Sequence, residues 1–476
     1  MRTKWSRFFS ANRIHPDGGQ ELQDVHALRS DASRDWDRII FSPSLRRMHD
    51  KTQVFPLAPD DMTHSRLTHS LEVGSVGRSL GNGVGSLLER RGALPDGWTH
   101  RDVGDIVAAA CLAHDIGNPP FGHSGEDAIG SFFRRFLDQD TVRMLDLTAA
   151  QRHDLEHFEG NAQGFRILTR RESAGTGLRL TATTLATFLK YPRFNDERAP
   201  LLKELDPTPP VYRKKFGVFC SEAEILRSVA AQTGMIADPD GAGSGYIRHP
   251  LAWLVEAADD ICYRVIDLED GVHLRLIPLD TARGCLTDLI HVIDPTSRSR
   301  SDDRLDALRG SAIHALVVRV GEIFEVHADA IASGQVTRGL LDHDEFCNTH
   351  LGRLKELVET NCYCARDVLE IELAGYELLG RLVGRLVCAA LKVRSASHTQ
   401  LQDLWILNQK ESQTRIPGKA EAEKLLRLCG LDSVVAKAET HYHALLQITD
   451  HVSDMTDSSA VKLYRHLFGT SLPNQD

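Results

Sequence analysis

The stretch over residues 114–126 concentrates side chains that could do chemistry. It follows an apolar run over 106–113 that predicts a buried helix, which Gly117 and the two prolines after it would end. An imidazole and a carboxylate at the end of a buried helix need polar partners. A divalent cation would satisfy His114 and Asp115 together, and so would a network of hydrogen bonds. The pair alone leaves both interpretations open.

Two more residues of this stretch form a candidate pair for proton transfer. His123 precedes Glu126 by three residues, and we expect a helix over about 125–137 with Glu126 in its first turn. The helix macrodipole favours a carboxylate there. This spacing brings the carboxylate close enough to orient the imidazole. A simple helix cap would have the same sequence pattern.

A further histidine lies on a helix predicted over residues 63–90. Arg66 and His69 are three residues apart and share one stripe with valines further along, so both face inward. A single inward histidine is most often an ordinary core residue. His69 gains interest as a metal ligand because His114 and Asp115 would need others.

Polar residues also align along the helix that Pro250 is expected to start. Asp259, Tyr263 and Asp267 recur at intervals of four on a helix whose other positions are apolar. Two carboxylates and a phenol on one face suit a functional site better than a core.

Two basic segments could bind an anion. The segment 212–217 contains Arg213, Lys214 and Lys215 in a short turn, and Arg46, Arg47 and Lys51 cluster earlier in the chain. Clustered charge is normally a solvated surface. The turn would also suit a polyphosphate.

Helical periodicity dominates the whole sequence and predicts an all-α fold. Strand-like alternation is scarce, and we find no internal repeat. The polar segment 295–303 is the best candidate for a linker, which divides the chain into a helical unit over 1–294 and a C-terminal helical region over 295–476. Helices are expected in the second part over 304–333, 343–360, 365–395, 419–448 and 458–468.

Composition narrows the class of protein. The chain has 476 residues, 42% of them hydrophobic, which is enough for one large core or two moderate ones. Its net charge of −10 argues against a dedicated nucleic-acid coat protein. The nine scattered cysteines contain no CxxC pair, so zinc-finger spacing is absent and a disulfide framework is not expected. Without a secretory signal or an apolar stretch of roughly 20 residues, we expect a cytoplasmic protein with no membrane contact.

Together these motifs resemble a known family. His69, His114-Asp115 and Asp259 match the ligand set of the HD superfamily of metal-dependent phosphohydrolases, and the residues around them are similar to the bacterial deoxyguanosinetriphosphate triphosphohydrolases. The resemblance runs through nearly the whole chain. It is carried by the blocks 46–55, 66–73, 114–126, 158–163, 256–263, 369–376 and 450–469.

The resemblance implies an HD-type catalytic helical core over 1–294 and a C-terminal helical region over 295–476 that completes the site and makes oligomer contacts. It also implies a definite reaction. Water would attack the α-phosphorus of a deoxynucleoside triphosphate (dNTP), dGTP or another, giving a deoxynucleoside and intact triphosphate. His69, His114, Asp115 and Asp259 would hold a divalent ion. Their mixed nitrogen and oxygen donors suit Mg, Mn, Fe, Co or Ni. His123, oriented by Glu126, would serve as the proton donor or would activate a water molecule.

The same resemblance assigns substrate contacts. Arg66, Lys190 and Lys215 would neutralise the triphosphate, and Tyr263 would donate a hydrogen bond nearby. Gln53 and Asp267 would bind the sugar 3′-hydroxyl, Val54 would crowd a 2′-hydroxyl, and Glu372 would lie near the base. The sequence departs from the family near its C-terminus, where Asp454 stands in place of the usual glycine before Met455-Thr456-Asp457. This departure bears on base preference or subunit contacts.

Two other functions fit part of the pattern. A different HD phosphohydrolase, such as an alarmone hydrolase, would share His114 and Asp115 but would carry an acidic pair where Asn118 and Pro119 stand. A regulatory protein that binds nucleotides or single-stranded DNA without catalysis is the second alternative. Relatives also suggest a homo-oligomer and activation by single-stranded DNA or a dNTP.

Overall fold

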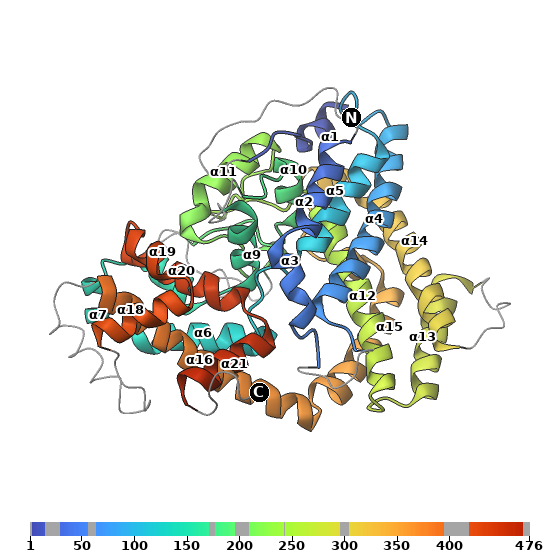
Figure 1. Cartoon of the computed structure of the whole chain (residues 1–476). Coiled ribbons are helices and arrows are strands. Elements are labelled where there is room, and N and C mark those ends of the chain that lie inside the picture. The colour runs from blue at the N-terminus through green and yellow to red at the C-terminus, as the bar shows by residue number, and fades with distance from the viewer. Residues whose placement is uncertain are drawn as a thin grey trace.

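The computed structural model describes residues 2–14, 29–55, 63–170, 177–195, 209–241, 243–295, 304–394 and 418–469. Within these ranges the chain forms helices joined by turns, with isolated β-bridges and no β-strand (Figure 1). The predicted all-α class is therefore confirmed. None of the described helices combines the length and hydropathy needed to cross a membrane.

The larger core is built around three helices that lie side by side. These are α4 (Arg66–Arg90), α5 (His100–Ala113) and α12 (Ala252–His273), and α2 (Asp31–Ile40) and α14 (Leu305–Ala332) cover them. Small residues let α4 and α5 approach closely. A Cβ atom on Gly81 would lie 2.9 Å from the Cα atom of Gly104.

The second core joins the middle of the chain to its C-terminal end. The long helix α16 (Arg366–Arg394) packs against α6 (Gly122–Phe136), α18 (Lys419–Leu428) and α20 (His441–Asp454), and it runs along the bottom of Figure 1. The remaining helices are α1 (Arg2–Trp5), α3 (Pro43–Arg47), α7 (Gln139–Met144), α8 (Ala149–Glu156), α9 (Gly160–Thr169), α10 (Ala182–Phe188), α11 (Ala223–Gln232), α13 (Leu279–Ile293), α15 (Glu345–Val358), α19 (Asp432–Lys437) and α21 (Asp457–Leu467).

Most predicted helices have their expected ends, and two need correction. Helix α6 begins at Gly122, three residues earlier than expected, so Glu126 does not lie in its first turn. The single helix expected over 419–448 is three helices, α18, α19 and α20. Gly430 adopts φ +68° after α18, a left-handed conformation that a continuous helix excludes.

Both cores draw residues from either side of position 294. The larger one extends from Trp5 to Val368, and the second combines residues of α6 with residues of α16 and α20. The linker residues 296–303 lie outside the described residues. The boundary between the two predicted units stays a prediction.

Candidate active site

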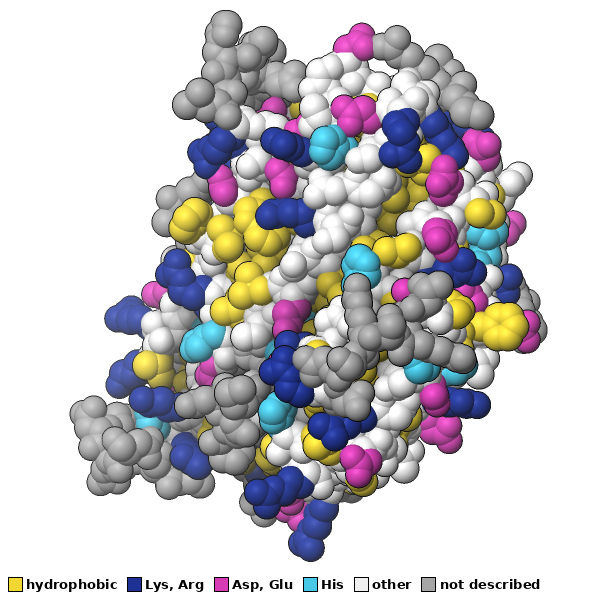
Figure 2. Space-filling model, turned by 90° about the vertical axis from the view of Figure 1, so that its right-hand side faces the viewer, with side chains coloured by type: hydrophobic (Ala, Val, Ile, Leu, Met, Phe, Trp, Pro, Cys, Tyr) yellow, Lys and Arg dark blue, Asp and Glu magenta, His cyan; other side chains and the backbone are white. Residues whose placement is uncertain are grey.

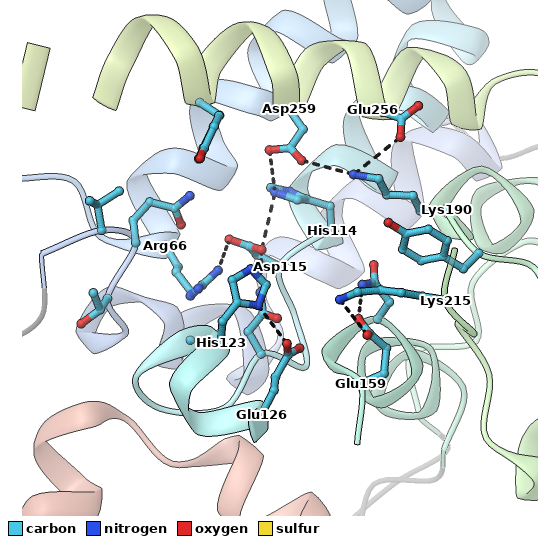
Figure 3. A pocket seen from close by; sticks show the side chains of 18 of the residues that line it. Arg66, His114, Asp115, His123, Glu126, Glu159, Lys190, Lys215, Glu256 and Asp259 are labelled. Atoms are coloured by element: carbon cyan, nitrogen blue, oxygen red, sulfur yellow. Dashed lines mark hydrogen bonds and ion pairs between the residues drawn. The ribbon is translucent and has the colours of Figure 1, made fainter. Parts of the chain in front are cut away.

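A cavity of about 430 Å³ lies where the two cores meet (Figure 3). Helices α4, α6, α12 and α16 contribute lining residues, and so do the turn that follows α5 and a π-helical turn over Glu359–Tyr363. The cavity therefore combines parts of the chain that are far apart in sequence. Its wall is rich in charged side chains of both signs.

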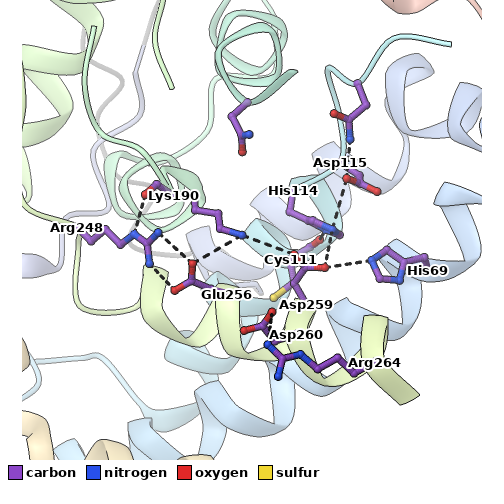
Figure 4. Close-up of polar contacts among 12 residues, drawn as sticks. His69, Cys111, His114, Asp115, Lys190, Arg248, Glu256, Asp259, Asp260 and Arg264 are labelled. Carbon is purple, nitrogen blue, oxygen red and sulfur yellow. Dashed lines mark hydrogen bonds and ion pairs between the residues drawn. The ribbon is translucent and has the colours of Figure 1, made fainter. Parts of the chain in front are cut away.

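Three of the four predicted metal ligands, His114, Asp115 and Asp259, line one end of this cavity, and the fourth, His69, is buried beside them (Figure 4). One donor atom each from His69, His114 and Asp115 lies within 4.8 Å of the others. The Oδ1 atom of Asp259 lies 3.3 Å from Nε2 of His69 and 3.5 Å from Nε2 of His114. The residues therefore converge from α4, the end of α5 and α12.

The donor set fits a divalent cation. Nδ1 of His114 donates to the backbone oxygen of Cys111 at 2.7 Å, which leaves Nε2 as the ligand atom. Burial lowers the pKa of His114, but Asp115 and Asp259 outweigh burial and raise this pKa to about 9. The carboxylates thus create a negative field at the place where the two histidines could coordinate an ion.

Arg66 and Asn118 hold the carboxylate of Asp115 in place. Arg66 donates to Oδ2 at 2.7 Å, and the side-chain amide of Asn118 donates to Oδ1 at 2.6 Å. Burial raises the pKa of Asp115, but the neighbouring cations, Arg66 first, lower it to about 2. Asp115 is therefore charged at neutral pH and can act as a ligand.

His123 and Glu126 form the contact that their spacing suggested. Nδ1 of His123 donates to Glu126 at 2.9 Å, and the His123 side chain keeps 87% of its surface exposed. Glu126 is buried and also accepts a hydrogen bond from the backbone N–H of Gly160 at 2.7 Å. The hydrogen bond with Glu126 raises the pKa of His123. This leaves Nε2 of a readily protonated imidazole facing the open cavity.

Close backbone packing supports this pair. Phe121 and Gly122 adopt φ +60° and +57°, which turns the chain sharply into α6. Glycine is required at position 160, because a Cβ atom there would lie 2.6 Å from the Glu126 carboxylate. The turn and the glycine together fix where the His123 ring stands.

The three predicted triphosphate contacts, Arg66, Lys190 and Lys215, all line the cavity. Lys215 lies 2.8 Å from Glu159, and Lys190 lies 3.7 Å from Glu256. Burial lowers the pKa of Lys190, but Glu256 together with Asp259 and other neighbouring groups outweighs burial, so the pKa is raised and the ammonium stays charged. The cations are thus paired with carboxylates that phosphate oxygens could replace.

A buried arginine holds Lys190 and Glu256 together. Nε of Arg248 donates to the backbone oxygen of Lys190 at 2.7 Å, and its two terminal nitrogens donate to Glu256 at 2.5 and 3.1 Å. The Arg248 side chain is fully buried beside Trp253. This bidentate contact fixes Glu256, which in turn faces Lys190.

Two of the three predicted sugar contacts lie in the cavity wall, and the third lies behind it. Gln53, Val54 and Tyr263 line the cavity, and the Gln53 side-chain oxygen is buried without a hydrogen-bond partner among the described residues. Asp267 is not part of the cavity wall. It is 1% exposed and accepts a hydrogen bond from the Tyr363 hydroxyl at 2.7 Å.

Several lining residues were not predicted as site residues. Tyr363 stands between Asp267 and the cavity, and only the π-helical turn brings it there. Glu159 and Glu256 belong to sequence blocks that resemble the family, so these blocks could have indicated both residues as site residues. Tyr363 has no such signal, because its neighbours in space are about a hundred residues away in sequence.

Comparison with known proteins places this site in a family. The HD domain family matches residues 66–172, which include three of the four clustered ligands. A deoxyguanosinetriphosphate triphosphohydrolase-like protein of Synechocystis sp. is 36% identical over 471 residues, covering 98% of this chain and 100% of that protein. The chain belongs to the deoxyguanosinetriphosphate triphosphohydrolase family.

Other members of this triphosphohydrolase family are similar along their whole length. A triphosphohydrolase-like protein of Pseudomonas aeruginosa is 37% identical, with 94% of this chain and 95% of that protein covered. A deoxyguanosinetriphosphate triphosphohydrolase of Enterobacter sp. is 30% identical, with 98% of each covered. The predicted family is therefore confirmed, and its HD domain implies a divalent metal ion at His69, His114 and Asp115.

Proposed function

We propose that this protein hydrolyses dNTPs, dGTP or another, to a deoxynucleoside and inorganic triphosphate. One observation carries the proposal: the ligand cluster that His69 completes from behind the wall, the His123–Glu126 pair and three cationic side chains meet at a single cavity. The printed names of the relatives support it. We describe below what each group of residues would do.

His69, His114, Asp115 and Asp259 would hold the metal ion, and we propose Mg, Mn, Fe, Co or Ni because the donors are nitrogen and oxygen. When bound, such an ion polarises a phosphoryl oxygen and lowers the pKa of bound water. Lys190 and Lys215 would bind the triphosphate by exchanging their carboxylate partners for phosphate oxygens. Arg66 would keep its contact with Asp115 and bind the triphosphate through its other N–H groups.

His123 is the proposed acid. Nε2 of the protonated ring would give its proton to O5′ as the bond between the α-phosphorus and O5′ breaks, so the deoxynucleoside leaves as a neutral alcohol. Glu126 would hold the ring through Nδ1 and stabilise its positive charge. The oxygen of the attacking water stays on the triphosphate.

The sugar and base contacts are proposed from the cavity wall. Gln53 would use its unpaired oxygen to accept a hydrogen bond from the 3′-hydroxyl, and Val54 would leave a 2′-hydroxyl crowded and unpaired. Tyr263 would bind near the phosphates. Asp267 would act on the sugar only through Tyr363, because the Tyr363 hydroxyl lies between Asp267 and the cavity. Glu372 lines the cavity and would lie near the base.

Product analysis tests the proposed reaction. Each of the four dNTPs is incubated with metal-loaded protein, beside the variant Asp115→Ala, and products are separated by ion-exchange chromatography. We expect the unmodified protein to release deoxynucleoside and triphosphate in equal amounts. We expect neither product from the variant. Release of pyrophosphate or monophosphate would indicate another HD phosphohydrolase. No turnover, even with single-stranded DNA or mixed dNTPs added as activators, would indicate a regulatory binding protein.

We also propose a cytoplasmic homo-oligomer whose C-terminal region, 295–476, completes the site. Tyr363 and Glu372 of that region line the cavity.

Exposed apolar side chains on α14, among them Val318 and Val326 at 48% and 79% exposure, suit a contact with a second copy. Figure 2 shows the α13–α14 face, where hydrophobic side chains lie among charged ones. Light scattering at several protein concentrations, with and without single-stranded DNA or dNTPs, tests assembly and activation.

A further inference from the structure

A second cavity of about 360 Å³ adjoins the first. Glu126, Glu159 and Lys215 line both cavities, so only these side chains and their neighbours separate the two spaces. Its volume is within the range of roughly 300–1,000 Å³ that is usual for small-molecule sites. The proposed reaction gives this second space no role.

The second cavity is lined by five cationic side chains and three carboxylates, Glu126, Asp127 and Glu159, although the protein as a whole is acidic. The residues that line it and not the first cavity include four with cationic side chains and a single carboxylate, that of Asp127. The cations are Arg134, Arg193, Arg213 and Lys214. The net charge of the chain is −10, so this concentration of positive charge is local. Such a cavity favours a compact anion of high charge.

Two of these cations have no carboxylate partner within the described part of the chain. The Arg134 guanidinium donates to the backbone oxygen of Glu156 and to the hydroxyl of Ser131, both at 2.6 Å, and these acceptors are uncharged. Lys214 is exposed and makes no ion pair with a described residue. Arg213, in contrast, is already paired with Asp238 and Asp240. Arg134 and Lys214 are therefore the cations whose charge no carboxylate of a described residue neutralises.

A histidine in the wall also lacks partners. Both ring nitrogens of His153 are buried and accept or donate no hydrogen bond within the described residues, while the ring stacks on His157 at 4.2 Å. Buried ring nitrogens are normally satisfied. A phosphate oxygen in the cavity would accept a hydrogen bond from the one N–H that a neutral imidazole carries.

Lys215 connects the two cavities. Its ammonium lies 2.8 Å from Glu159 (Figure 3), and both side chains line both spaces. A triphosphate that leaves the first cavity can therefore stay in contact with Lys215 while it gains Arg134 and Lys214. We propose that the second cavity binds the triphosphate chain released by the reaction. The assignment of the anion to the product rests on the proposed function.

Titration calorimetry with inorganic triphosphate and Mg²⁺ on the full-length protein tests this site. We expect two binding sites in the unmodified protein. In the double variant Arg134→Ala/Lys214→Ala, the affinity of the second cavity for triphosphate should fall at least tenfold, so that one site remains detectable. The matched control is Arg143→Ala/Lys424→Ala, which removes an exposed arginine and an exposed lysine outside both cavities and should retain two sites. The kcat and KM for a dNTP should change less than twofold in either double variant.

A single site in the unmodified protein, or two unchanged sites in Arg134→Ala/Lys214→Ala, would overturn the proposal. The same titration with ATP identifies the source of the anion, because the first cavity is expected to exclude ribose. Binding of ATP to the second site as tightly as inorganic triphosphate would overturn its assignment to the product. Calorimetry needs no turnover, so failure of the proposed reaction is detected separately, by the product analysis above.

Discussion

One carboxylate oxygen of Asp457 accepts a hydrogen bond from the backbone N–H of Phe121 at 3.0 Å, across 336 positions of the chain. The other oxygen accepts one from the backbone N–H of Thr52, also at 3.0 Å, and a short one from the Thr52 hydroxyl. Phe121 begins the turn into His123, and Thr52 precedes Gln53. One residue at the start of α21 thus holds the backbone beside the proposed acid and beside the proposed sugar contact.

We predict that Asp457→Asn lowers kcat/KM by about tenfold to a hundredfold, because an amide has one acceptor oxygen and small misplacement of reacting groups is costly. Steady-state kinetics on a dNTP measures this, and metal content should stay at the level of the unmodified protein. The control Asp140→Asn changes an exposed carboxylate and should have no effect. Equal kinetics in both variants would show that Asp457 does not position the site.

Removal of a metal ligand should abolish turnover. We expect Asp259→Asn to lose most of its bound metal and its activity, because Asp259 faces both His69 and His114. Elemental analysis and dNTP hydrolysis measure the two effects, and a chelator should reproduce the loss of activity in the unmodified protein. The neighbouring Asp260 faces Arg264 instead, so Asp260→Asn should keep its metal. Retention of metal by Asp259→Asn would contradict the assignment.

The pH profile should report the state of His123. As an acid the ring works when protonated, so kcat should fall as pH rises through its pKa, which Glu126 raises. In Glu126→Gln the charge is lost, and this limb should move to lower pH. His123→Ala should lower kcat by about 10²–10⁴ and remove the limb. An unchanged alkaline limb in both variants would exclude His123 as the acid.

Val54 should determine part of the preference for deoxyribose. We expect Val54→Ala to raise the kcat/KM for a ribonucleoside triphosphate relative to the dNTP by roughly tenfold, since one or two methyl groups in a pocket discriminate on that scale. Competition between the paired substrates measures the ratio. Val84→Ala removes the same atoms from the core of α4, away from the cavity, and should leave the ratio unchanged. If the two variants discriminate alike, Val54 is not near the 2′ position.

The contact between α9 and α20 should make stability depend on pH. Asp450 is buried and accepts hydrogen bonds from Arg166 at 2.8 Å and Gln163 at 2.7 Å. Burial raises the pKa of Asp450, but Arg166 and Arg170 together with the hydrogen bonds outweigh burial, so the pKa is lowered in the folded protein. The contribution of Asp450 to stability is therefore complete above the unfolded pKa, about 3.9, and is lost as pH falls through the folded pKa.

Asp450→Asn should lower the free energy of unfolding by about 3 kcal/mol at neutral pH, because it removes one of the two carboxylates, Asp450 and Glu222, that pair with the buried Arg166. The difference from the unmodified protein should shrink in acid. Urea denaturation at pH 7 and at about pH 2, below the unfolded pKa of Asp450, measures both values. Glu439→Gln, at an exposed position, is the control. An equal loss at the two pH values would show that the carboxylate charge is not the cause.

Local patterns in the sequence predicted much of the molecule. Ser65 caps α4 and accepts a hydrogen bond from the backbone N–H of Thr68, as expected for a short polar residue before a helix. His123 and Glu126 meet at 2.9 Å because residues three apart on a helix are neighbours. These features depend on a few consecutive residues, so the chain needs no distant contact to specify them.

Contacts between residues far apart in the sequence could not be predicted from local patterns. Nothing local indicates that Tyr363 covers Asp267, that Arg248 fixes Glu256, or that Lys215 joins two cavities. The types and spacings of His114, Asp115 and the other motif residues determined the family, the all-α class and the candidate metal ligands. Only the tertiary structure decided which side chains line the cavity and which lie behind it, because those contacts arise from the packing of helices that are far apart in sequence.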